Sequence, residues 1–208
     1  MVISVIIPAY NEAGNIGVIA QKAADQLKHR GPYEIIFVDD GSTDSTLHEI
    51  KQVAEKNGNI KYISLSRNFG HQRALKAGLD NATGDCVISM DSDLQHPPEL
   101  IDELIRKWEE GYDVVYTIRK DPDNIGYFKK TTSKLFYKII NMISDVDVPL
   151  GSADFRLLDK KVINELRKFK ENFLFVRGLV SWLGFNQTGI EYETHNRYSG
   201  TSKYSLRK

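Results

Sequence analysis

Short apolar runs alternate with amphipathic stretches along the first 118 residues of the chain. Residues 2–7 are almost wholly apolar, a pattern typical of a parallel strand that is covered on both faces. Residues 15–28 instead carry apolar side chains at helical spacing. The whole pattern predicts strands at 2–7, 33–38, 60–65, 86–90 and 113–118, and helices at 15–28, 45–56, 72–81 and 99–109.

This order of elements predicts an α/β fold with a mostly parallel sheet and helices on both faces. Beyond residue 118, the pattern predicts helices at 128–143, 162–168 and 174–183, and strands at 153–158 and 187–194. The helix at 128–143 has one apolar stripe and one lysine stripe. It is therefore either a surface helix with a solvated basic face or a helix that lies on a membrane.

Composition narrows the class of protein. A chain of 208 residues suits one domain, and 28 basic against 28 acidic residues give no electrostatic case for nucleic acid as a partner. The single cysteine, Cys86, falls in a predicted buried strand, so we expect it to pack in the core of a protein from a reducing compartment. The N-terminus reads as a strand rather than a signal peptide, and no apolar run approaches the roughly 20 residues needed to span a bilayer. We expect a cytoplasmic chain.

An acidic turn follows the strand at 86–90. Ligands in open α/β sheets bind beyond the carboxyl ends of the strands, which is where Asp91, Asp93 and Gln95 are expected. These side chains offer oxygen ligands at alternate positions, the kind that Mg²⁺ or Mn²⁺ prefers. The alternative is a turn whose aspartates cap the next helix, which Pro97 and Pro98 can begin.

Two further groups of polar residues are candidates for chemistry. Period-two spacing places Asp154 and Arg156 on one face of the strand at 153–158. They form either a salt bridge on an exposed face or an acid aimed into the site opposite the metal. The tail from residue 195 onward is basic and lacks acids, so it is either solvated or suited to an acceptor phosphate.

Several motifs occur in one order along essentially the whole chain: residues 8–12, 38–44, 66–70, 91–98, 151–156 and 197–204. With these motifs the chain resembles the inverting family 2 glycosyltransferases, which have the Rossmann-like GT-A fold. It resembles most the branch that uses polyprenyl phosphates, similar to dolichol-phosphate mannose synthase and the bactoprenol glucosyltransferases. The resemblance implies a nucleotide-diphosphate sugar donor and a divalent metal, Mg²⁺ or Mn²⁺.

The resemblance also implies roles for individual residues on the donor side. Those implied to bind the nucleotide sugar are Pro8, Tyr10, Glu12, Asp39, Asp40, Arg67 and Asp91. Asp39 would accept a hydrogen bond from the base imide, with Asp40 close by, and Arg67 would reach the nucleotide. Asp93 and Gln95 would ligate the metal, and Asp91 would contact the metal or the ribose.

On the acceptor side, the resemblance implies that Asp154 is the catalytic carboxylate. A sugar hydroxyl would need it as a base, whereas a phosphate monoester is already mostly dianionic, so Asp154 would then orient the acceptor or the sugar. Arg197, Ser202 and Lys203 match the loop for the acceptor phosphate. We therefore expect one GT-A domain in two halves, with residues 1–118 binding the nucleotide sugar and residues 119–208 forming the smaller acceptor-side extension.

The expected function is transfer of a hexose from a nucleotide-diphosphate sugar, by analogy a UDP-sugar, to a polyprenyl phosphate at the cytoplasmic face of the membrane. One alternative is a same-fold enzyme that acts on a saccharide hydroxyl in cell-surface polysaccharide synthesis. Another is a non-catalytic nucleotide-sugar binding protein. A dinucleotide-binding dehydrogenase is excluded, because no Gly-x-Gly-x-x-Gly follows the first strand. Members of this branch often continue into membrane helices, so we expect either a piece of a longer protein or an enzyme that meets the membrane peripherally.

Overall fold

The computed structural model describes residues 1–119, 152–169 and 175–193. The strands in this part are β1 (Ile3–Ala9), β2 (Tyr33–Asp39), β3 (Ile60–Ser64), β4 (Cys86–Ser89), β5 (Val114–Arg119), β6 (Ser152–Asp159) and β7 (Gln187–Tyr192). The helices are α1 (Ile16–Leu27), α2 (Thr46–Lys56), α3 (His71–Asn81), α4 (Leu100–Glu109), α6 (Lys160–Leu166) and α7 (Val176–Trp182). Every predicted element in this part occurs, with ends that differ by at most two residues. The predicted lysine-striped helix and the basic tail lie outside the described residues.

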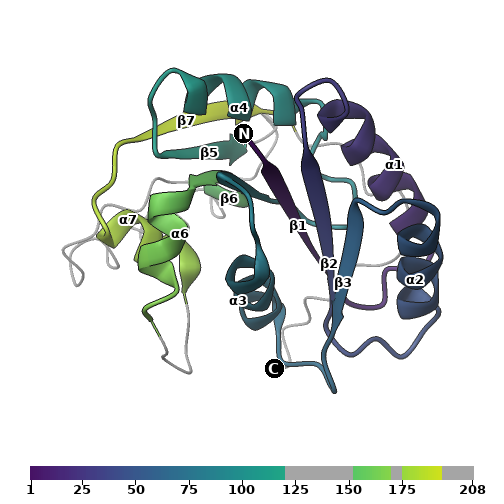
Figure 1. Ribbon diagram of the computed structural model, residues 1–208. Coiled ribbons are helices and arrows are strands. Elements are labelled where there is room, and N and C mark those ends of the chain that lie inside the picture. Colours follow the sequence, from purple (N-terminus) through teal and green to yellow (C-terminus); the bar gives the residue numbers. More distant parts are fainter. Residues whose placement is uncertain (120–151, 170–174, 194–208) are drawn as a thin grey trace, which may run out of the picture.

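The strands form one sheet in the order β3-β2-β1-β4-β6-β5-β7. Strands β1, β2, β3 and β4 pair in parallel, and β5 pairs in parallel with β7. Only β6 runs antiparallel to its two neighbours, β4 and β5. The predicted mostly parallel sheet is confirmed, and strands from both halves of the chain share it (Figure 1).

Helices cover both faces of this sheet, and each face has its own apolar core (Figure 1). Alternate residues of β1 show the division, because Ile3, Val5 and Ile7 pack toward α1, α2 and α4, whereas Ile6 packs toward α3, α6 and α7. Cys86 is fully buried in the first core, as predicted, and burial raises the pKa of its thiol to about 12. No described helix has the length and apolar character needed to cross a membrane.

The antiparallel strand β6 corrects one expectation. Its neighbours cover both edges and the helices cover both faces, so Asp154 and Arg156 are only 9% and 4% exposed. The expected exposed strand face is therefore wrong, although the two side chains do form an ion pair at 3.9 Å. The acid of β6 is buried beside the end of β4.

The carboxyl ends of β1, β2, β3 and β4 meet at one rim of the sheet. Ala9 pairs with Asp39, and Asp39 pairs with Ser64. The chain leaves β4 beside β1, where the Met90 N–H donates to the Ile6 carbonyl at 3.0 Å. The turns that follow these strands are thereby brought to one place.

Candidate active site

The acidic turn after β4 has a defined backbone. Oδ1 of Asp93 accepts a hydrogen bond from the Gln95 N–H at 3.1 Å, and Leu94 between them has a φ of 63°. The turn does not cap α4, because the residue before that helix is Glu99 and forms no side-chain cap hydrogen bond. The helix-capping alternative is therefore wrong. Asp93 is nearly buried, whereas Asp91 keeps part of its surface exposed.

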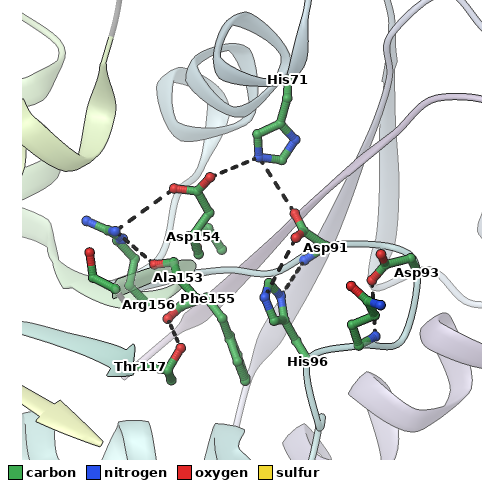
Figure 2. A network of polar contacts seen from close by, with 12 residues as sticks. His71, Asp91, Asp93, His96, Thr117, Ala153, Asp154, Phe155 and Arg156 are labelled. Carbon is green, nitrogen blue, oxygen red and sulfur yellow. Dashed lines mark hydrogen bonds and ion pairs between the residues drawn. The ribbon is translucent and has the colours of Figure 1, made fainter. Parts of the chain in front are cut away.

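His96 supports this turn from below (Figure 2). Its Nδ1 accepts a hydrogen bond from the Asp91 N–H at 3.1 Å, and its Nε2 lies 3.7 Å from Oδ2 of Asp91. The ring stacks on Phe155 of β6 at 5.2 Å and meets the edge of Tyr192 at 6.0 Å. In neutral His96 the proton therefore sits on Nε2, the nitrogen that faces the Asp91 carboxylate.

His71, the first residue of α3, lies between two carboxylates (Figure 2). Its Nε2 is 3.6 Å from Oδ1 of Asp91 and 3.5 Å from Oδ2 of Asp154. Burial by itself would lower the pKa of His71, but the two acids outweigh burial and raise it. The positive imidazole is favoured, and it links the acidic turn to the acid on β6.

Asp40 sets the position of His71. Its Oδ1 accepts the Phe69 N–H at 2.7 Å and its Oδ2 accepts the Gly70 N–H at 2.9 Å. These two bonds hold the backbone that enters α3, so the carboxylate after β2 fixes where the helix starts. The adjacent Gly41 packs against the backbone of Arg67 and Asn68, where any Cβ would lie as close as 2.7 Å to the amide nitrogen of Asn68.

Asp154 is surrounded by cationic groups. Arg177 of α7 donates two hydrogen bonds to its carboxylate, from Nε to Oδ1 at 2.8 Å and from Nη2 to Oδ2 at 3.0 Å. The guanidinium of Arg156 lies 3.9 Å away and donates to the Ala153 carbonyl at 2.8 Å; burial lowers the pKa of Arg156 to about 10. Burial would raise the pKa of Asp154, but His71, Arg177 and Arg156 outweigh it and hold the pKa well below its usual range. Asp154 is a persistent carboxylate and a weak base.

The implied nucleotide-binding residues lie at the same rim. Pro8 and Asp39 are buried in β1 and β2, and Asp39 accepts hydrogen bonds from the Ser42 N–H at 3.2 Å and the Ser64 hydroxyl at 3.4 Å. Glu12 is nearly buried and accepts from the Asn15 amide at 2.7 Å. The Arg67 guanidinium is exposed and lies 4.2 Å from the centre of the Phe69 ring.

Tyr10 follows β1 with part of its surface exposed. The implied donor-side residues therefore gather at one rim, which fits a single ligand there. Asp39 and Asp40 already bind neighbouring groups of the chain, so any contact of theirs with a nucleotide stays a prediction. Arg197, Ser202 and Lys203 lie outside the described residues.

The oxygen ligands of the acidic turn fit a hard divalent cation in part. Asp91, Asp93 and Gln95 supply two carboxylates and an amide oxygen within five residues. In the described part of the chain, no group of three or more His, Cys, Asp or Glu side chains is arranged to hold a metal by itself. Such a partial set suits an ion whose coordination is completed by a diphosphate rather than by the protein alone.

Three residues with clear structural places in this site had no predicted role: His71, His96 and Arg177. His71 follows the motif at residues 66–70 and His96 lies within the motif at 91–98, but their contacts depend on the meeting of β4, β6 and α3. Arg177 is the single charged residue between positions 173 and 185. A charged side chain that is buried within an apolar stretch needs a partner of opposite charge or a hydrogen bond. This pattern could have identified Arg177 as a candidate site residue.

Comparison with known proteins identifies the family of the chain. The profile described as Glycosyl transferase family 2 matches residues 4–167. The chain belongs to this family. The match covers β1 through β6 and includes both the acidic turn and Asp154.

Relatives extend the likeness over almost the whole chain. An uncharacterized glycosyltransferase of Bacillus subtilis, YkcC, is 44% identical over 99% of this chain, and the chain spans 64% of its length. The bactoprenol glucosyl transferase of Shigella phage SfV is 39% identical over 99% of the chain, which spans 67% of that protein. The chain thus spans about two thirds of the length of these family members.

A solved structure supports the fold. A mannosyltransferase from Pyrobaculum calidifontis, in complex with GDP-Man and Mn²⁺, superimposes with a TM-score of 0.66. The match has 17% sequence identity and covers 95% of this chain and 57% of that one. The chain has the GT-A fold, as the sequence resemblance implied.

Proposed function

We propose that this protein is an inverting, metal-dependent hexosyltransferase that uses a nucleotide-diphosphate sugar, by analogy a UDP-sugar, and a polyprenyl phosphate acceptor. The observation that carries the proposal is that His71 lies between Asp91 and Asp154. Its Nε2 is 3.6 Å from Oδ1 of Asp91 and 3.5 Å from Oδ2 of Asp154. It puts the candidate metal turn and the candidate catalytic carboxylate around one point at the carboxyl rim of the sheet. Family membership supports glycosyl transfer, and the name of the bactoprenol glucosyl transferase supports a lipid phosphate acceptor.

On the donor side, Asp91, Asp93 and Gln95 would hold Mg²⁺ or Mn²⁺ together with the diphosphate. The metal would stabilise the negative charge that develops on the departing nucleoside diphosphate. Asp39, Tyr10 and Arg67 would contact the nucleotide from the neighbouring strand ends. Mn²⁺ and GDP-Man in the mannosyltransferase of similar fold favour this assignment.

In the reaction, a phosphate oxygen of the acceptor attacks the anomeric carbon from the side opposite the diphosphate. A carbon–oxygen bond forms, and the bond to the nucleoside diphosphate breaks with its electron pair, which inverts the carbon. A lipid phosphate has a second pKa near 6 and is mostly dianionic, so its attack requires no base. The lowered pKa of Asp154 favours a role in orienting the acceptor or the sugar over a role as general base.

The remaining assignments complete the proposal. Residues 1–118 would bind the donor, and residues 119–208 would bind the acceptor through Arg197, Ser202 and Lys203. Because the acceptor is a lipid, catalysis would take place at the cytoplasmic face of the membrane. Basic segments in the second half would be attracted to anionic lipid there.

The deciding experiment measures release of nucleoside diphosphate from a panel of UDP- and GDP-sugars, with Mg²⁺ or Mn²⁺, in the presence and absence of a short polyprenyl phosphate. Turnover of one donor only with the lipid phosphate is the expected result. Turnover that needs a saccharide hydroxyl instead would favour the same-fold alternative. Donor binding without turnover on either acceptor would favour a binding protein.

A further inference from the structure

Arg177 donates hydrogen bonds to two residues of β6 at the candidate site, Asp154 and Ser152. It lies at the start of α7, and two N–H groups of its guanidinium fork, Nε and Nη2, donate to the two carboxylate oxygens of Asp154 at 2.8 and 3.0 Å. Its Nη1 also donates to the Ser152 carbonyl at 2.8 Å. Two parallel N–H bonds to one carboxylate fix both the position and the plane of that carboxylate.

Gln72 ties the same region together from a second side. Its amide nitrogen donates to Oδ2 of Asp154 at 3.3 Å, and its amide oxygen accepts the Val176 N–H at 3.2 Å. Helix α7 is therefore joined to Asp154 directly through Arg177 and indirectly through α3. This double connection holds Arg177 against the carboxylate.

The charge around Asp154 matters for the acceptor. Asp91, Asp93 and Asp154 are three carboxylates in one region, and a phosphate dianion has to approach them during the proposed reaction. An unpaired carboxylate would repel such an acceptor, because charges at short range in a partly buried site are weakly screened. Arg156 lies farther from Asp154, at 3.9 Å, so Arg177 is the nearest guanidinium that offsets its charge.

We propose that Arg177 is a positioning residue for glycosyl transfer: it holds the Asp154 carboxylate in one orientation and offsets its charge, so that an anionic acceptor can approach the anomeric carbon. This inference rests on the proposed function. The sequence already placed α7 in the acceptor-side half but gave none of its residues a role, and the inference supplies one.

A purely structural ion pair is the competing explanation. A partly buried pair of this kind contributes little net stability, yet removing one partner leaves an uncompensated charge. Arg30 provides a matched control, because it also joins carboxylates, Asp102 and Glu109, and is about equally exposed. It lies in the turn after α1 and connects this turn to α4.

The test compares Arg177→Ala, Arg177→Lys and Arg30→Ala, each with its thermal unfolding recorded. In steady-state transfer to a short polyprenyl phosphate, Arg177→Ala should lower kcat/KM for the acceptor about 30- to 100-fold. The KM for the donor should change less than about threefold. Arg177→Lys should recover part of the loss, since it restores charge without the fork, and Arg30→Ala should match the wild type in transfer.

A double variant separates action through Asp154 from direct contact with the acceptor. In an Asp154→Asn background the charge to be offset is gone, so adding Arg177→Ala should change calorimetric affinity for the lipid phosphate less than about threefold. An equally large loss in both backgrounds would overturn the inference.

The single variants can also overturn it. If the wild type transfers sugar to the lipid phosphate and Arg177→Ala keeps the wild-type kcat/KM for the acceptor, the inference fails while the proposed function stands. If the wild type neither binds nor glycosylates the lipid phosphate, the proposed function fails and the inference falls with it. If Arg177→Ala does not fold, Arg177→Lys carries the comparison, and wild-type acceptor kinetics in that variant would contradict the proposal.

Discussion

Nδ1 of His96 accepts a hydrogen bond from the backbone N–H of Asp91 at 3.1 Å. The histidine is nearly buried and stacks on Phe155, so it fixes the first residue of the candidate metal turn to β6. In His96→Phe the ring can still stack, but the Asp91 N–H loses its acceptor. We expect apparent Mn²⁺ affinity in the presence of donor to fall roughly 10-fold, because groups that orient metal ligands have effects of this size. Calorimetric titration with Mn²⁺ in the presence of donor measures this affinity.

The control for His96 is His48→Phe. His48 is exposed on α2, and its ring forms a hydrogen bond with the Gln52 amide. That variant should bind Mn²⁺ as the wild type does. Equal Mn²⁺ affinity in His96→Phe and His48→Phe would show that the histidine does not orient the turn.

Asp93 is expected to be required for the metal to act. Removing its carboxylate takes one oxygen ligand from an already partial set, so Asp93→Ala should lower turnover at least about 100-fold. Chelator in excess should do the same to the wild type. Asp25→Ala removes an exposed aspartate that pairs with Lys28 at 2.9 Å on α1, and it should retain turnover. A normal rate for Asp93→Ala in excess chelator would contradict the metal role.

Gly41 is expected to be irreplaceable in the turn after β2. It has a φ of 68°, and an added Cβ would come far too close to the backbone of Arg67 and Asn68. Both strain and overlap oppose a side chain, so Gly41→Ala should cost about 2–4 kcal/mol of unfolding free energy. Displacing Arg67 should also weaken donor binding. Urea unfolding and donor titration measure the two effects.

Gly17 is the matched control for that substitution. It lies exposed in α1, and nothing stands within 4 Å of the Cβ that alanine would add. Gly17→Ala should therefore stabilise the protein by about 0.5–1 kcal/mol, through better helix propensity. Destabilisation of similar size at both positions would remove the case for a special turn at Gly41.

Much of the fold could be predicted from the sequence because its strands are short apolar runs that end in polar turns. The runs at β1, β2 and β4 identify buried parallel strands, and parallel pairing by itself brings their ends to one rim. The placement of Asp39 and Asp91 at that rim followed from this rule. No long-range information was needed.

The surroundings of Asp154 could not be predicted in the same way. Burial of β6 on both faces depends on its insertion between β4 and β5, and alternation along one strand does not reveal its neighbours. Arg177 lies 23 positions from Asp154 in the chain, so no local spacing connects them. The pairing arises only when α7 packs beside α3 and β6.

Glu34 lies at the end of β2 opposite the candidate site. We expect this residue to make the stability of the protein depend on pH in the acid range. Burial by itself would raise the pKa of Glu34, but hydrogen bonds from Lys61 at 2.7 Å, Ser4 at 2.6 Å and Thr83 at 2.7 Å lower it to about 2. Since the folded pKa lies below the ordinary value of 4.5, the stabilisation is present above pH 4.5 and is lost as the pH falls toward 2.

The size of that effect follows from the shift in pKa, at about 1.4 kcal/mol per unit, which gives on the order of 3 kcal/mol. In urea unfolding at pH 6, the free energy of unfolding of the wild type should exceed that of Glu34→Gln by about this amount. The difference should shrink steadily between pH 4.5 and pH 2. Glu165→Gln, which removes an exposed glutamate paired with Lys168 on the surface, should show little dependence of this kind. A difference between wild type and Glu34→Gln that stays constant across this range would mean that the hydrogen bonds to Glu34 do not depend on its charge.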